Sequence, residues 1–204
     1  VDEITIQGYK SIKSLEEFEL KNLNILIGAN GVGKSNFISA FRLLNEMYNK
    51  RLQLYTQSKS PDNFLYFGRK HTEKIFFQFK FKLNAYSFTL IPAAENKLFI
   101  EREEVLFNGP YFGTKKEILG ENLEEARIGE VEKYISYEPM IPYLKSINNW
   151  KIYHFHDTSD TSKMKGKCAS IDNLIFKQDA QNLAPYLKML KDKFKEHYEQ
   201  IIAT

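Results

Sequence analysis

The stretch LNILIGANGVGKSNFISAF (23–41) decides the fold. Its first six residues are mostly apolar, a glycine-rich turn follows, and the rest is amphipathic with helical spacing. The turn GANGVGKS (28–35) fits the pattern G-x-x-x-x-G-K-[ST] at every fixed position. We therefore predict a strand buried on both faces at 23–28, a phosphate-binding loop after it, and then a helix.

The residue types in the loop explain the expected chemistry. Glycines let the backbone curl so that successive N–H groups face an anion, and the following helix adds the positive end of its dipole. Lys34 is expected to reach the β- and γ-phosphates of ATP or GTP, and Ser35 to supply a hydroxyl ligand to Mg²⁺. The predicted nucleotide-binding residues of the loop are Asn30, Gly31, Val32, Gly33, Lys34, Ser35 and Asn36. A chance glycine-rich turn is disfavoured because a strand-like and a helix-like segment flank it.

The first third of the chain has further periodic segments. Residues 4–12 alternate like a half-buried strand, and 15–20 are predicted as the hairpin partner of that strand. Apolar residues spaced by four, three and four predict a helix from Lys34 to about Gln57.

The rest of the chain changes character. Three runs that alternate aromatic or aliphatic with polar residues predict an antiparallel meander, and further elements follow it. The expected elements are strands at 73–84, 85–94 and 97–108, a loop at 108–122, a helix at 123–138, a strand at 150–160 and an amphipathic helix at 182–202.

Composition bounds the function. The 204 residues carry 29 basic and 26 acidic side chains, a net charge of +3, which is too even to indicate nucleic-acid binding by itself. Cys168 is the only cysteine, so we expect a reducing, cytoplasmic setting. No apolar run reaches the length of roughly 18 to 20 residues that a membrane span needs, so we expect no membrane association.

The nucleotide class follows from what surrounds the loop. The base-recognition motif of GTPases is N-K-x-D, and neither NKLF (96–99) nor TKKE (114–117) fits it. Small-molecule kinases usually begin with the phosphate-loop strand, whereas residues 1–22 precede that strand here. Both observations disfavour these two classes of P-loop protein.

The segment preceding the loop carries a resemblance. ITIQGYKSI (4–12), followed by LNILIGANGVGKSN (23–36), resembles the N-terminal segment of ABC-type ATPase heads of the RecF/SMC group, including the overcoming-lysogenization-defect type. The end of the chain, FKQDAQNLAPYLKMLKDKFKEHYEQII (176–202), looks like a bacterial branch of the same group. The meander between them is poorly covered by the resemblance.

The resemblance implies an α/β fold: a P-loop NTPase with an ABC-ATPase-like lobe, built from a mixed sheet, an antiparallel β-subdomain and a helical C-terminal end. It implies ATP and Mg²⁺ as cofactors, and homodimerisation of heads with ATP sandwiched between them. It also implies a coupled activity involving DNA or a partner effector protein. Tyr9 and Lys10 are implied near the base and ribose, and Gln178 or Gln181 as the Q-loop glutamine, ahead of Gln78.

Two elements of that family are missing from these 204 residues. We find neither four apolar residues followed by Asp-Glu nor a serine-glycine signature. Asp157, at the end of IYHFHD, is a weak substitute for the missing carboxylate because Thr follows it. We therefore expect the chain to be the N-terminal lobe of a longer ATPase, one that hydrolyses ATP poorly by itself.

Other candidate sites receive plainer interpretations. His154 and His156 alternate on one predicted strand and, with Asp157, suggest a metal cluster, but a zinc site needs three or four ligands and a third is not evident. The basic residues at 163–167 and 115–117 are interpreted as solvated rather than as contacts to DNA phosphates. The phenylalanines of the meander are interpreted as sheet packing rather than as a base-stacking platform.

We predict one lobe with three parts: a P-loop core at 1–60, an antiparallel β insertion at 61–122 and an α-rich part at 123–204. Two alternative functions remain. A P-loop kinase or other phosphotransferase would use the same loop on a small substrate. A nucleotide-sensing interaction module without catalysis would suit the missing carboxylates.

Overall fold

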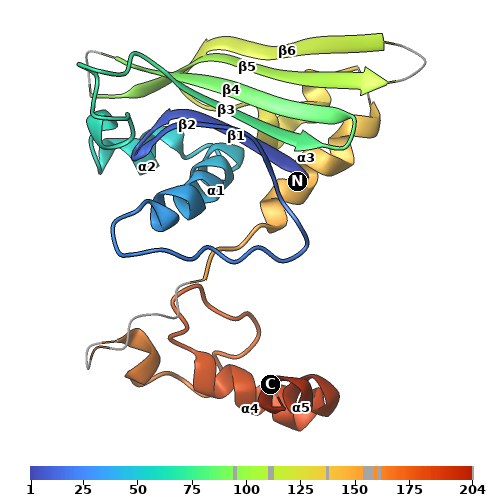
Figure 1. The fold of residues 1–204 in the computed structure, drawn as a ribbon. Helices are drawn as coiled ribbons and strands as arrows, with labels where there is room; N and C mark the ends of the chain where they lie inside the picture. Colours follow the sequence, from blue (N-terminus) through green and yellow to red (C-terminus); the bar gives the residue numbers. More distant parts are fainter. Residues whose placement is uncertain (94–95, 110–112, 137, 154–158, 160–161, 204) are drawn as a thin grey trace. The chain divides into compact units, whose positions relative to one another are not determined.

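The computed structural model describes residues 1–203 apart from 94–95, 110–112, 137, 154–158 and 160–161 (Figure 1). It divides into two compact units, Val1–Trp150 and Lys151–Thr204. In the described part of the chain, no helix combines the length and the apolar character that crossing a bilayer requires.

The first unit is built on one six-stranded sheet with the order β2-β1-β3-β4-β5-β6. Every neighbouring pair is antiparallel. The strands are β1 (Glu3–Tyr9), β2 (Ile12–Glu19), β3 (Ile75–Phe81), β4 (Asn84–Pro92), β5 (Leu98–Gly109) and β6 (Gly113–Leu123). The predicted hairpin and meander are confirmed, whereas the expected mixed sheet is wrong for this unit because it is antiparallel throughout.

The loop predicted at 108–122 is wrong, because most of this stretch belongs to strand β6. This strand lies at the edge of the sheet, and only Leu119 and Gly120 of its residues are buried. An edge strand needs just one pairing partner and can carry polar side chains along most of its length. The glycines and charged residues of this stretch therefore gave a loop-like composition to a paired strand.

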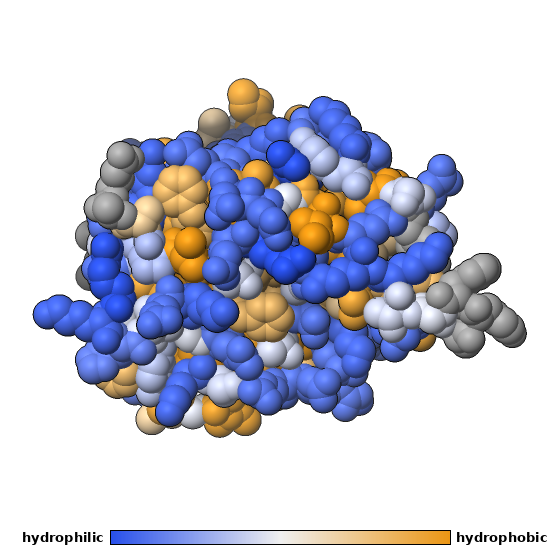
Figure 2. All heavy atoms as spheres, turned by 90° about the horizontal axis from the view of Figure 1, so that it is seen from above, coloured by the Kyte–Doolittle hydropathy of each residue, from blue (hydrophilic) through white to orange (hydrophobic). Residues whose placement is uncertain are grey.

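Helix α1 (Lys34–Tyr48) packs on one face of the sheet (Figure 1). Its buried residues join the aromatic side chains of β3 in a single hydrophobic core. Phe41 of α1 lies with its ring centroid 6.1 Å from that of Phe79 and 5.7 Å from that of Trp150. Figure 2 views the sheet side of the molecule, where hydrophilic residues predominate and hydrophobic ones form small separate patches.

The helix predicted from Lys34 to about Gln57 is interrupted. It ends at Tyr48, Lys50 adopts a left-handed φ of 54°, and a short helix α2 (Leu52–Gln57) follows. The carboxylate of Glu125 accepts hydrogen bonds from the backbone N–H groups of Leu52 and Gln53, at 2.8 and 2.9 Å. This distant carboxylate satisfies the free donors that a helix start creates, so tertiary contact fixes the break.

The helix predicted at 123–138 is wrong. Residues Ile128–Lys133 form a 3-10 helix, η2, with a non-helical φ of −127° at Glu130. A Cβ atom on Gly129 would lie 2.2 Å from the carbonyl oxygen of Tyr48, so this backbone packs directly against the end of α1. Close tertiary packing overrides the helical propensity of the segment. The remaining helices of this unit are η1 (Pro61–Asn63), η3 (Glu138–Met140), α3 (Ile141–Ser146) and η4 (Ile147–Asn149).

The segment 23–28 also departs from its prediction. It forms no strand, and Leu23 and Ile27 are 77% and 91% exposed. A strand buried on both faces needs hydrogen-bonded neighbours on both sides. In the described part of the chain, segment 23–28 pairs with none of the six strands of the sheet.

The second unit contains η5 (Lys163–Lys165), α4 (Leu183–Lys193) and α5 (Lys195–Ile202). The single helix predicted at 182–202 is divided at Phe194, where φ is −136° and ψ is 58°. In the strand predicted at 150–160, residues 150–153 have no regular structure, and most of the others lie outside the described residues.

Candidate functional site

The phosphate loop enters helix α1 through glycines in left-handed conformations. Gly31 has φ 87° and Gly33 has φ 104°, values that a side chain would strain. Gly33 is the N-cap of α1, which has neither a side-chain cap nor an acidic residue in its first turn. The first N–H groups of this helix are therefore available to an anion, as a phosphate site requires.

Two side chains complete the predicted phosphate site. The ammonium of Lys34 donates hydrogen bonds to the carbonyl oxygens of Gly28 and Ala29, at 2.6 and 2.8 Å. It therefore lies over the loop that would hold phosphates. Ser35 is exposed in the first turn of α1. Its hydroxyl fits one ligand position of a Mg²⁺ ion that takes its other ligands from phosphates and water.

The tip of the β1–β2 hairpin lies against this loop. Asn36 donates a side-chain hydrogen bond to the hydroxyl of Ser11 at 2.9 Å. A Cβ atom on Gly33 would lie 2.7 Å from the same hydroxyl oxygen. The hairpin that carries the family resemblance is thus in direct contact with the start of α1.

Tyr9 and Lys10, predicted near a base and ribose, have different environments. Tyr9 is fully buried, and its hydroxyl lies 2.9 Å from that of Ser39. Its burial raises the pKa of the phenol well above the ordinary value. Tyr9 thus has no surface with which to touch a ligand directly, whereas Lys10 lines a cavity.

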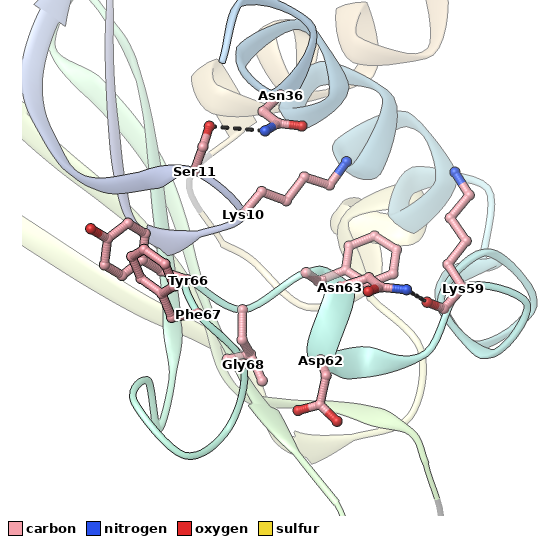
Figure 3. Close-up of a pocket in the computed structure, with 11 residues that line it drawn as sticks. Lys10, Ser11, Asn36, Lys59, Asp62, Asn63, Tyr66, Phe67 and Gly68 are labelled. Carbon is pink, nitrogen blue, oxygen red and sulfur yellow. Dashed lines mark hydrogen bonds between the residues drawn. The ribbon is translucent and has the colours of Figure 1, made fainter. Parts of the chain in front are cut away.

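That cavity has a volume of about 780 Å³ and lies beside the phosphate loop (Figure 3). Ligand pockets are commonly of this size. It is lined by Lys10, Ser11, Asn36, Lys59, Asp62, Asn63 and the run 64–68. The cavity thus joins the hairpin tip and the first turn of α1 to the 59–68 segment.

Sequence reasoning missed the 59–68 segment as part of a site. It follows the end of the predicted helix at about Gln57 and carries none of the motifs that indicate a site. The backbone N–H of Lys10 donates to the carbonyl of Phe64 at 2.8 Å, and that of Tyr66 donates to Gly8 at 2.9 Å. No motif marks these long-range contacts, so the sequence carries no signal for them.

The glutamines considered for a Q-loop are dispersed. Gln178 is exposed in a turn of the second unit, whose placement relative to the phosphate loop is not defined. The backbone N–H of Gln181 donates to Asp179 at 3.3 Å. Gln78 is half-buried in β3, paired with Thr5 and Ser87. The Q-loop role of Gln178 or Gln181 stays a prediction.

The remaining candidates keep their plainer interpretations or are not described. His154, His156 and Asp157 lie outside the described residues, and the described residues hold no cluster of three or more metal-ligating side chains.

Both basic spots show an ion pair. Lys163 pairs with Asp179 at 3.0 Å and Lys116 with Glu104 at 2.8 Å. Phe77, Phe79 and Phe88 are stacked inside the core, so they offer no surface for bases.

Comparison with known families decides the broader assignment. The model of the family described as "AAA domain, putative AbiEii toxin, Type IV TA system" matches residues 23–167, well over half of the chain. The chain belongs to this family. It therefore carries an AAA-type P-loop ATPase domain, and the match begins at the apolar segment that leads into the phosphate loop. No curated protein and no solved structure gave a match.

Proposed function

We propose that this AAA-type domain is the ATP-binding lobe of a RecF/SMC-like ATPase. The observation that carries the proposal is the entry into α1, where two left-handed glycines, an uncapped helix start and the Lys34 ammonium converge. Backbone donors, a helix dipole and one lysine are the elements that bind nucleotide phosphates.

In this proposal the β- and γ-phosphates of ATP lie on residues 28–35, with Mg²⁺ at Ser35. The ribose and base extend over Asn36 towards the cavity that Lys10 lines, because that cavity adjoins the first turn of α1. Head-to-head dimerisation and hydrolysis belong to the complete ATPase. The coupled process is DNA repair, DNA maintenance or phage defence. The resemblance of 4–12 and 23–36 to RecF/SMC heads supports this finer assignment.

The second candidate is a nucleotide-sensing module without catalysis. It applies if no Asp-Glu strand end beyond these 204 residues, which contain none, is supplied to position Mg²⁺ and water. A phosphotransferase has no comparable support, since the arginines after the loop are few and scattered.

Calorimetric titration with ATP and Mg²⁺ tests the proposal. Wild-type chain should bind ATP, and Lys34→Ala should weaken binding by at least about tenfold, or about 1.4 kcal/mol, because it removes the charge facing the phosphates. Lys50→Ala is the matched control, since Lys50 pairs with Glu130 beyond the end of α1. Equal affinities of Lys34→Ala and Lys50→Ala would refute binding at this loop.

Single-turnover hydrolysis separates the two candidates. The sensing module predicts binding without turnover in any assembly that contains this chain. The ATPase lobe predicts turnover once a chain that supplies an Asp-Glu strand and a signature motif is added.

A further inference from the structure

We propose that Lys10 and Lys59 form a phosphoryl-binding site in the cavity beside the phosphate loop. This site is additional to the loop itself, and no motif in the sequence marks Lys59 as part of it. Its ligand is a phosphoryl group: either the α-phosphate of the nucleotide, which lies between the phosphates on the loop and the ribose, or that of a separate phosphorylated molecule. The first source rests on the proposed function, and the second does not.

Lys10 is held in place by both backbone and side chain. It occupies the tip of the β1–β2 hairpin with a left-handed φ of 51°, an uncommon conformation for a residue with a side chain. Its backbone N–H donates to Phe64, and its ammonium donates to the hydroxyl of Ser39 at 2.7 Å. The ammonium also lies 5.1 Å from the ring centroid of Tyr9 and 5.5 Å from that of Phe64. An ammonium has three N–H donors, so this arrangement leaves capacity for an anion.

Lys59 approaches the cavity from the other side. It follows α2, and its ammonium lies 4.4 Å from the ring centroid of Tyr55. Figure 3 shows the side chains of Lys10 and Lys59 both extending towards the helices, away from the Asp62 carboxylate. That carboxylate accepts hydrogen bonds from the guanidinium of Arg69, at 3.0 and 3.2 Å. The one acidic residue lining the cavity is therefore already neutralised.

Neither ammonium group is in an ion pair in the described part of the chain, although the carboxylate of Glu46 partly offsets the positive charge around Lys59. Among the ion pairs of the described residues, neither Lys10 nor Lys59 has a carboxylate partner. Burial, together with the positive charges of Lys59 and Arg42, lowers the pKa of Lys10 to about 8. Repulsion between like charges that no ion pair neutralises is relieved when an anion binds between them.

The neighbourhood indicates a phosphoryl group as the anion. The cavity continues to Ser11 and Asn36, which touch each other beside the phosphate loop. Lysine binds phosphate as a compact point charge, and hydroxyl and amide groups add hydrogen bonds. The competing interpretation is that both lysines only cover aromatic rings, as cation–π packing does.

The test measures binding of two probes, ATP with Mg²⁺ and inorganic phosphate, to the full chain by calorimetry. The double variant Lys10→Gln/Lys59→Gln removes both charges, and Lys13→Gln is the control for charge loss elsewhere on the same hairpin. A phosphoryl group of the nucleotide predicts ATP binding about tenfold weaker in the double variant than in the control. A separate ligand predicts phosphate binding that survives Lys34→Ala and is lost in the double variant.

The outcomes separate this inference from the proposed function. If the wild-type chain binds phosphate but not ATP, the proposed function is refuted. The inference is then decided by whether phosphate binding survives Lys34→Ala and is lost in the double variant. Double-variant affinities within about twofold of the control for both probes would overturn the inference, as would wild-type chain that binds neither probe. Circular dichroism verifies folding, and if the double variant unfolds, Lys59→Gln alone is measured, because Lys59 is exposed.

Discussion

The segments 75–81 and 23–27 are both rich in large apolar residues, yet the structure treats them in opposite ways. In IFFQFKF every second residue is buried, and the rings of Phe77 and Phe79 stack at 6.1 Å. In LNILI the residues lie outside any strand, and all five are exposed. Both stretches look like strands, so composition alone cannot account for the difference.

The difference is one of partners. β3 lies between β1 and β4, which pair with it along its length. Segment 23–27 leads from the edge of the hairpin into the phosphate loop, and the side chain of Asn24 makes only a local hydrogen bond to the carbonyl of Lys21, at 2.7 Å. Burial of a strand requires that its backbone groups be paired. The comparison therefore teaches that an apolar run predicts burial only where hydrogen-bonding neighbours exist.

The largest expected effect comes from truncating one residue in each segment. Phe79→Ala should destabilise the protein by about 3–5 kcal/mol, because it leaves a cavity in the core. Ile27→Ala should change the free energy of unfolding by no more than about 0.5 kcal/mol, as at other exposed positions. Guanidinium denaturation measures both. A loss above about 2 kcal/mol for Ile27→Ala would show that this segment is covered in solution.

The next largest loss of stability is expected from removing a carboxylate that is buried in strand β5. Glu103 in β5 is fully buried and accepts hydrogen bonds from the hydroxyl of Tyr86 at 2.9 Å and from the N–H groups of Arg127 and Ile128, at 2.8 and 2.9 Å. Glu103→Ala leaves these donors unsatisfied and should cost about 3 kcal/mol. Glu101→Ala, at an exposed position two residues earlier, is the control. Equal stabilities of the two variants would contradict this role.

Much of the fold was predictable because it is local. The hairpin of β1 and β2 and the meander of β3 to β5 follow from alternation and short breaks, which act between neighbouring residues. The break between α1 and α2 could not be predicted, because it depends on Glu125, more than 70 residues away. The same is true of η2, where Gly129 meets Tyr48 and Glu103 caps the chain.

The candidate site likewise has a part that local sequence determines and a part that depends on distant contacts. The left-handed glycines and the helix start within residues 28–36 were predictable because they are set locally, while nucleotide binding by these residues stays a prediction. Lys59 was not, because its approach to Lys10 depends on how the 59–68 segment packs on the hairpin tip. The Q-loop role of Gln178 stays a prediction, since this residue lies in the other unit.

Backbone strain in the loop gives a smaller effect. Gly33→Ala combines φ 104° with a Cβ position 2.7 Å from the hydroxyl oxygen of Ser11, so it should destabilise the protein by about 1–2 kcal/mol and weaken ATP binding. Gly31→Ala has φ 87° but open space around its Cβ position, and about 1 kcal/mol is expected. Thermal unfolding with and without ATP compares them. A costlier Gly31→Ala would mean that the contact with Ser11 is not formed.

The smallest effect is a pH dependence at the hairpin tip. Lys10 has a folded-state pKa of about 8, below its ordinary value of 10.5, so the folded protein binds fewer protons between these values. Stability should therefore rise with pH from about 8 to 10.5 through this group, and be reduced at lower pH. Tyr9, Lys59 and Arg42 face Lys10. Because other groups also titrate in this range, the contribution of Lys10 is the difference in pH-dependent stability between wild type and Lys10→Gln.

Denaturation at pH 7.5 and pH 9.5 measures that difference. Lys10→Gln should gain less stability over this interval than wild type, while Lys13→Gln should follow wild type, because Lys13 is exposed on β2. Inorganic phosphate should diminish the wild-type slope if an anion compensates the charge of Lys10. Identical slopes for wild type and Lys10→Gln would mean that the ammonium is as well solvated as that of Lys13. The side chain of Lys10 would then be solvent-exposed like segment 23–27, and not packed like the residues of the sheet.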